Sequence, residues 1–85
     1  MMNKKITIYS TPTCHYCQMA KEFFKTHKVV FEEHNVATDA ARRKEMVDKS
    51  GQLGVPVITV SDENGSNESI VIGFDQPKLA KLIGV

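Results

Sequence analysis

The sequence predicts a small α/β fold in which four strands and three helices follow the order βαβαββα. Three observations support it: strand-like runs alternate with segments of helical spacing, an Asn-Gly turn separates the last two strand-like runs, and 85 residues suffice for one compact core. Because a strand–helix–strand unit implies a right-handed parallel crossover, we expect a four-stranded mixed sheet. Residues 1–85 are expected to form a single domain.

The first strand and helix follow from two different periodicities. Lys4 to Ser10 alternates around isoleucines, which is typical of a short strand. The turn Thr11-Pro12-Thr13 ends it, and Thr13 is the predicted N-cap of the helix that follows. Side chains at three- and four-residue spacing mark one face of this helix: Cys17, Ala20, Phe23, Phe24 and His27.

The middle of the chain repeats the pattern. Val29 to Asn35 contains a Val-Val-Phe run and predicts the second strand. Thr38 or Asp39 is expected to cap a second helix that runs through Lys49, with Gly51 just beyond its end.

The last third predicts a hairpin and a terminal helix. Residues 55–60 and 69–72 are strand-like, and Asn64-Gly65 between them favours a tight antiparallel turn. Asp75 is the expected cap of the last helix, where Pro77 is tolerated in the first turn. Its apolar face is predicted to hold Leu79, Leu82 and Ile83.

Composition excludes several function classes. The chain is 41% hydrophobic and 25% charged, which excludes disordered, collagen-like and disulfide-framework proteins. Eleven basic and ten acidic residues give a net charge of +1, so we expect no nonspecific binding to nucleic acid or to anionic membranes. Residues 6–10 are too short for a signal-peptide core, and no transmembrane run is present, so the expected compartment is the cytosol.

The two cysteines, Cys14 and Cys17, are expected at the start of the first helix, just after the first strand and its turn. In the cytosol such a pair is typically catalytic or metal-binding. The unpaired N–H groups of a helix N-terminus favour a thiolate, so the pKa of the Cys14 thiol should lie below the value of about 8.5 of a free thiol. Cys14 is then the expected nucleophile, and Cys17 the residue that resolves its mixed disulfide.

Metal binding is the alternative from another class. Zinc prefers four ligands, and the chain offers two cysteines with His15, His27 and His34. Because His27 is expected at a helix end and His34 in the second strand, a zinc site within one chain is not expected. Two chains could instead share an iron–sulfur cluster or zinc through their cysteine pairs. A noncatalytic adaptor that keeps the fold for binding is a third reading.

Further segments extend the pattern around the cysteine pair. They are Ile8 to Cys17, Arg43-Lys44-Glu45-Met46 followed by Ser50-Gly51, Gly54-Val55-Pro56, and Gly73-Phe74-Asp75. In this order and spacing, the chain resembles the glutaredoxin family of the thioredoxin fold over nearly its full length. The resemblance implies a thiol-disulfide oxidoreductase.

The resemblance also implies a set of binding residues. It implies a cis bond before Pro56, with the main chain of Val55 offered to an extended thiol peptide. Arg43 and Asp75 match positions that meet the two ends of glutathione, and Tyr16 matches an aromatic residue beside it. Gly73 and Phe74 complete the implied substrate or glutathione site, with Phe74 either in the core or exposed for docking.

Three departures from the family pattern bear on the electron donor. Thr11 replaces a common lysine, Gly54 a common threonine, and Ile72-Gly73 a Gly-Gly pair that lets a peptide backbone approach closely. These differences resemble glutaredoxin-like proteins that accept electrons from thioredoxin reductase. Either glutathione, as a cosubstrate, or thioredoxin reductase therefore remains a candidate donor. We expect a monomer without a tightly bound cofactor, acting on disulfide-containing or glutathionylated proteins.

Overall fold

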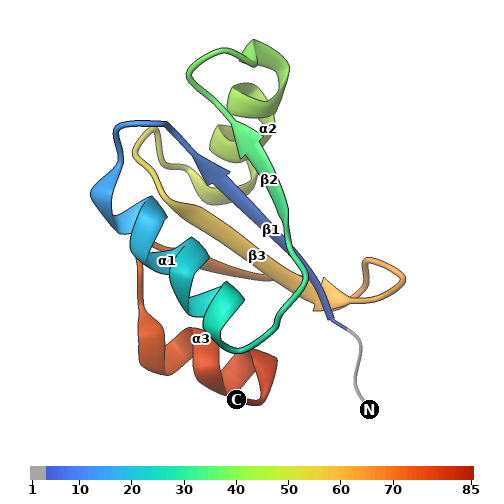
Figure 1. The fold of residues 1–85 in the computed structure, drawn as a ribbon. Coiled ribbons are helices and arrows are strands. Elements are labelled where there is room, and N and C mark those ends of the chain that lie inside the picture. Colours follow the sequence, from blue (N-terminus) through green and yellow to red (C-terminus); the bar gives the residue numbers. More distant parts are fainter. Residues whose placement is uncertain (1–3) are drawn as a thin grey trace.

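The computed structural model describes residues 4–85 and confirms the predicted order of elements. The elements are β1 (Lys4–Ser10), α1 (His15–Thr26), β2 (Glu32–Asn35), α2 (Ala40–Ser50), β3 (Val57–Asp62), β4 (Ser69–Ile72) and α3 (Gln76–Ile83). The strands lie in the order β2-β1-β3-β4, and β1 is parallel to β2 and antiparallel to β3. β3 and β4 form the expected antiparallel hairpin, so the predicted mixed sheet is confirmed (Figure 1).

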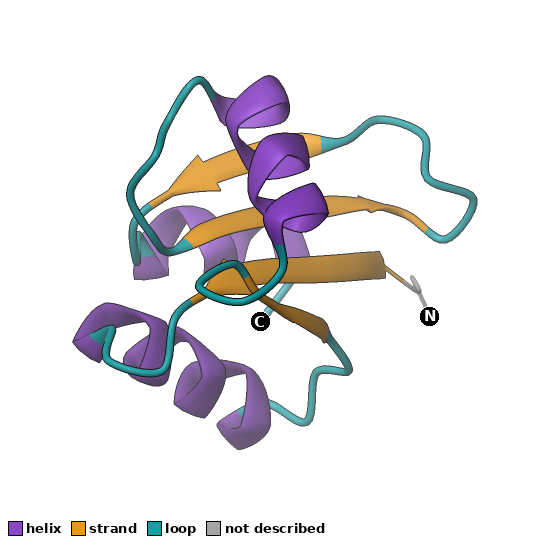
Figure 2. Cartoon of the chain, turned by 90° about the horizontal axis from the view of Figure 1, so that it is seen from above, coloured by secondary structure: helices purple, strands orange, loops and turns teal. Residues whose placement is uncertain are grey.

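Because side chains alternate along each strand, both faces of the sheet carry apolar side chains, and different helices cover them. α1 and α3 cover one face and α2 lies on the other (Figures 1 and 2). The larger core lies under α1 and α3; its buried members are Ile6, Ile8, Ala20, Phe23, Phe24, Ile58, Val60, Val71 and Leu79. The smaller core lies under α2 and consists of Tyr9, Val36, Met46 and Val57. α2 therefore covers its face with few apolar contacts.

Most predicted caps are confirmed. Asp39 begins α2 by accepting a hydrogen bond from the Arg42 N–H at 3.1 Å. Gly51 ends the same helix in the left-handed conformation, with φ of 71°. Asp75 caps α3 by accepting from the Lys78 N–H at 3.2 Å.

Three predicted boundaries are wrong. The N-cap of α1 is Cys14 and not Thr13, because the Cys14 sulfur accepts a hydrogen bond from the Cys17 N–H in the first turn of the helix. β2 begins at Glu32 and not at residue 29, because the Val29 N–H bonds back to the Phe24 carbonyl at the end of α1. β3 begins at residue 57 and not at 55, because Pro56 has no N–H to donate to the sheet.

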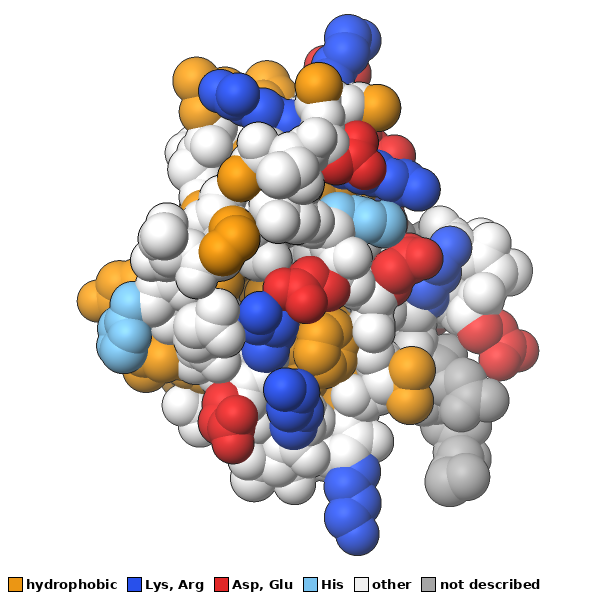
Figure 3. Space-filling model, turned by 45° about the horizontal axis from the view of Figure 1, so that its top comes forward, with side chains coloured by type: hydrophobic (Ala, Val, Ile, Leu, Met, Phe, Trp, Pro, Cys, Tyr) orange, Lys and Arg blue, Asp and Glu red, His pale blue; other side chains and the backbone are white. Residues whose placement is uncertain are grey.

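The surface mixes both signs of charge. Over the face drawn in Figure 3, Lys and Arg side chains alternate with Asp and Glu, and neither sign dominates a large area. Among residues 4–85, no helix is long and apolar enough to cross a membrane.

Met46 is the buried residue through which α2 is anchored to the sheet, and its side chain is fully buried. We predict that Met46→Ala lowers the free energy of unfolding by about 2–5 kcal/mol, because it leaves a cavity in a small core. Met19→Ala in α1 is the matched control, since Met19 is 39% exposed, and it should change stability by about 0.5 kcal/mol or less. Urea unfolding of both variants measures the difference; equal effects would contradict this account of α2.

Candidate active site

The register of the sheet brings three connecting segments to one end. Tyr9 of β1 pairs with Val57 of β3, and Val57 pairs with Ile72 of β4. The turn after β1, the loop before β3 and the segment after β4 therefore lie at the same end of the sheet (Figure 1). The Gly73 N–H donates to the Pro56 carbonyl at 2.9 Å and ties the last two together.

The cysteine pair occupies the start of α1 at this end. Cys14 and Cys17 form a disulfide, with their Cα atoms 5.2 Å apart. Cys14 is half-buried, whereas Cys17 is fully buried, so Cys14 is the more accessible of the two cysteines. The Cys17 N–H donates to that sulfur at 3.1 Å. Negative charge on the Cys14 sulfur is therefore favoured by a direct donor and by the positive end of the helix dipole.

Proline and an exposed ring border the predicted peptide-binding region. The Val55–Pro56 bond is cis, as the resemblance implied, and Pro56 is buried. Val55 is half-buried against the small core under α2. Tyr16 is 60% exposed, and its ring meets the His15 ring edge-on at a centroid distance of 5.7 Å. Tyr16 is thus free to contact a bound molecule.

The segment after β4 joins this end of the sheet to α3. Gly73 has φ of 77°, a conformation that favours glycine. Phe74 is half-buried, and its ring lies 5.9 Å from that of Phe23. Asp75 uses one carboxylate oxygen as the α3 cap, so the structural role predicted for it is confirmed.

Arg43 lies on α2, which covers the face of the sheet opposite α1 (Figures 1 and 2). Its side chain is exposed, and its backbone N–H donates to the Asp39 carbonyl at 3.0 Å. Within residues 4–85, its guanidinium forms no hydrogen bond or ion pair. The guanidinium is therefore available to a bound carboxylate.

The sequence analysis did not predict a polar network formed by Ser10, Lys21 and Glu33. Glu33 of β2 accepts from the buried Ser10 hydroxyl at 2.8 Å and from the Lys21 ammonium at 2.7 Å. The hydrogen bond from Lys21 is the main reason that the pKa of Glu33 lies below its usual value. A cavity of about 350 Å³ beside the network is lined by Ser10, Pro12, Gln18, Lys21, Glu33 and Asn35. The network joins α1 to two strands immediately behind the cysteine turn.

The histidines considered as metal ligands have other contacts. His27 is the C-cap of α1, and its ring lies 4.6 Å from that of Phe23. His34 lies 3.5 Å from the Glu32 carboxylate. In the part of the chain that the structure describes, no three His, Cys, Asp or Glu side chains gather as metal ligands.

The fold joins a parallel β1-α1-β2 unit to a β-hairpin. A C-x-x-C disulfide lies at the start of the first helix, and a cis-proline loop lies at the same end of the sheet. Together these features define the thioredoxin-like class. Within this class, the family model for glutaredoxin matches residues 6–64. The chain belongs to the glutaredoxin family.

Individual glutaredoxins and glutaredoxin-like proteins are similar to this chain. A glutaredoxin-like 8.6 kDa protein in the rubredoxin operon of Clostridium pasteurianum, itself uncharacterized, is 42% identical over 92% of this chain and 96% of its own length. Glutaredoxin 3 of Escherichia coli is 36% identical over 69% of this chain and 71% of its own. The solved glutaredoxin of Archaeoglobus fulgidus has a TM-score of 0.78 at 26% identity and covers 98% of this chain and 87% of that one.

The network around Glu33 predicts an acid-sensitive contribution to stability. Because the pKa of Glu33 is lower in the folded than in the unfolded chain, its stabilisation is complete above the unfolded value and is lost as pH falls through the folded one. Glu33→Gln should lower stability at pH 7 by at most about 1 kcal/mol, since Glu33 is partly exposed, and the difference should vanish in strong acid.

Urea unfolding at neutral and at acidic pH measures this difference. Glu22→Gln, at an exposed site on α1 without an ion pair among residues 4–85, is the control and should show no comparable trend. A Glu33→Gln difference that is as large in acid as at pH 7 would contradict the assignment.

Proposed function

We propose that this chain is a dithiol oxidoreductase in which Cys14 is the nucleophile and Cys17 the resolving residue. The observation that carries the proposal is the disulfide at the start of α1, which joins a half-buried cysteine to a fully buried one. Family membership supports thiol-disulfide chemistry for the pair. Residues 1–85 would act as one domain.

The proposed cycle transfers two electrons to the substrate. In the reduced protein, the Cys14 thiolate attacks one sulfur of a substrate disulfide, which releases the other sulfur as a thiolate. Cys17 then loses its proton and attacks the Cys14 sulfur of the mixed disulfide. The second substrate sulfur leaves as a thiolate and takes up a proton, and the Cys14–Cys17 disulfide is formed. Two thiols of the donor, or a flavoprotein reductase, return the pair to the dithiol.

The exposed groups at the same end of the sheet would bind the substrate. The main chain of Val55 would pair with an extended peptide beside Pro56, with Tyr16 packed against it. Gly73 and Phe74 would border the peptide, and the free Asp75 carboxylate oxygen would accept from an amino group. If glutathione binds, Arg43 would meet its glycine carboxylate, which requires the arginine to reach over from α2.

We propose redox proteins as the partners, namely proteins with a disulfide or a glutathione adduct, in the cytosol. Glutathione and thioredoxin reductase are the two candidate donors. Thr11, Gly54 and Ile72 stand where glutathione-dependent relatives commonly carry other residues, and this favours weak binding of glutathione. No tightly bound cofactor is required, and a monomer suffices for the cycle.

Replacing each cysteine separates the two roles. Cys14→Ser should abolish turnover of every substrate, because no nucleophile remains. Cys17→Ser should abolish reduction of protein disulfides, but it should retain some reaction with glutathione adducts if glutathione is the donor, because that reaction needs one thiol only.

Both variants are assayed with glutathione and its reductase, and in parallel with thioredoxin reductase and NADPH. One of the two donor systems should reduce the oxidised wild type rapidly. The resolving role of Cys17 is wrong if Cys17→Ser reduces protein disulfides at the wild-type rate.

A further inference from the structure

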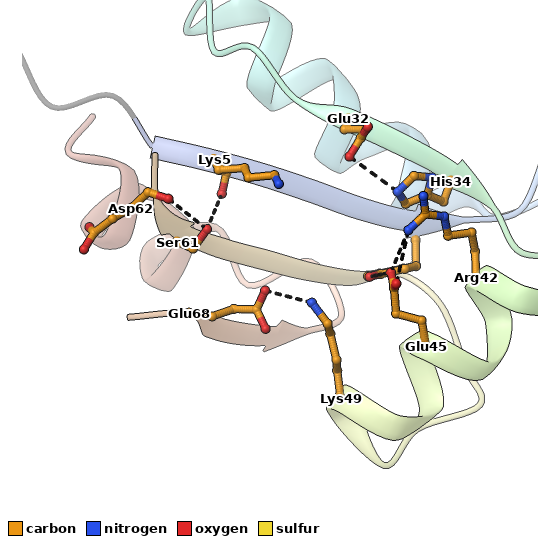
Figure 4. A network of polar contacts seen from close by, with 10 residues as sticks. Lys5, Glu32, His34, Arg42, Glu45, Lys49, Ser61, Asp62 and Glu68 are labelled. Atoms are coloured by element: carbon orange, nitrogen blue, oxygen red, sulfur yellow. Dashed lines mark hydrogen bonds and ion pairs between the residues drawn. The ribbon is translucent and has the colours of Figure 1, made fainter. Parts of the chain in front are cut away.

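A polar cavity lies on the α2 face of the sheet, on the other side of the sheet from α1. It has a volume of about 240 Å³. Its floor is formed by β1 and β3, and its walls by β2, by α2 and by the β3–β4 connection. Figure 4 shows the charged residues that surround this space. The volume is below that of typical drug-sized sites, so a ligand here would be a small metabolite.

Two hydroxyl groups at the floor have no hydrogen-bond partner in the described part of the chain. Thr7 and Thr59 are cross-strand neighbours, 7% and 3% exposed, and both line the cavity. Among residues 4–85, neither hydroxyl forms a hydrogen bond. Every fully buried side-chain oxygen or nitrogen in this range has a hydrogen-bond partner, so these two hydroxyl oxygens are not fully buried. Each hydroxyl therefore opens into the cavity. Buried hydroxyls are normally satisfied by protein, by water or by a ligand.

Most of the charges around the cavity are committed to one another. Arg42 binds the Glu45 carboxylate at 3.1 Å, and Glu45 also accepts from the Tyr9 hydroxyl. Lys49 binds Glu68 at 2.9 Å. These pairs close the α2 side of the cavity and leave no net charge there (Figure 4).

The remaining two charges are separated and of opposite sign. Lys5 lines the cavity, and its ammonium forms no ion pair with any residue of the range 4–85. Glu32 lies beside Thr7 in the sheet register and is 60% exposed, and within residues 4–85 its one partner is His34, at 3.5 Å. A free ammonium on β1 and a carboxylate on β2 thus flank the threonine hydroxyls.

From this arrangement we infer a binding site for a small zwitterion of the α-amino acid class. Its carboxylate would meet the Lys5 ammonium, its ammonium group would meet the Glu32 carboxylate, and the Thr7 and Thr59 hydroxyls would bind the polar centre between them. The inference does not rest on the proposed redox function, because the Cys14 sulfur lies at the start of α1 on the other side of the sheet.

Three matched probes test the ligand class. Alanine carries both charges, propionate lacks the amino group, and ethylammonium lacks the carboxylate. Titration of the oxidised, isotopically labelled protein with alanine should shift the amide resonances of Lys5, Thr7, Glu32 and Thr59 in a saturable way. Propionate and ethylammonium should bind at least about twofold more weakly, because each forms only one of two partly exposed ion pairs.

Thr59→Val removes one floor hydroxyl at nearly constant volume. Alanine should bind this variant about threefold to tenfold more weakly, as expected for a lost hydrogen bond. Thr26→Val, in α1 on the other face, is the matched control and should keep the wild-type affinity. If Thr59→Val does not fold, Lys5→Gln provides the same comparison at an exposed position.

Several results would overturn the inference. They are a shift that does not saturate with alanine, equal affinity for alanine and propionate or ethylammonium, and wild-type affinity in the folded Thr59→Val or Lys5→Gln variant. Disulfide reductase activity should be unchanged in Thr59→Val whether or not the zwitterion binds, so the two functions are tested separately.

Discussion

The hydrogen bond from the Cys17 N–H to the Cys14 sulfur is the interaction on which the proposed chemistry depends. It makes Cys14 the N-cap of α1, so one sulfur ends the strand-to-helix turn and satisfies a helix donor at the same time. The same helical turn places the second sulfur inward, where it is fully buried. One backbone geometry thus separates an accessible sulfur from a protected one, and a resolving mechanism needs that difference.

The mixed sheet supplies the surroundings of that sulfur. Parallel pairing of β1 with β2 sends the chain through α1, and antiparallel pairing with β3 returns the cis-proline loop to the same end. The large core packs α1 and α3 against the sheet, whereas α2 is attached through a small core, the hydrogen bond from the Tyr9 hydroxyl to Glu45 and the ion pair between Lys49 and Glu68. That incomplete cover leaves room for the polar cavity on the second face of the sheet.

Local patterns predicted the fold well, because strand alternation, helix spacing and the caps Asp39 and Asp75 are short-range features. Boundaries that depend on other elements were harder. Thr13 has the usual N-cap side chain, but the sulfur of the next residue takes that role. Neither the Glu33 network nor the hydroxyl pair of Thr7 and Thr59 has a local sequence signal. Both arise from the register between strands, which depends on the pairing of all the strands and not on any short stretch of sequence.

The most direct test of the central claim is the ionisation of the Cys14 thiol. In the reduced Cys17→Ser variant, Cys14 is the single cysteine and the backbone N–H at residue 17 is retained. Thiolate absorbance followed against pH should show half-ionisation clearly below the pKa of about 8.5 of a free thiol. A midpoint at or above that value would contradict the account, because the start of α1 would then provide no stabilisation of the nucleophile.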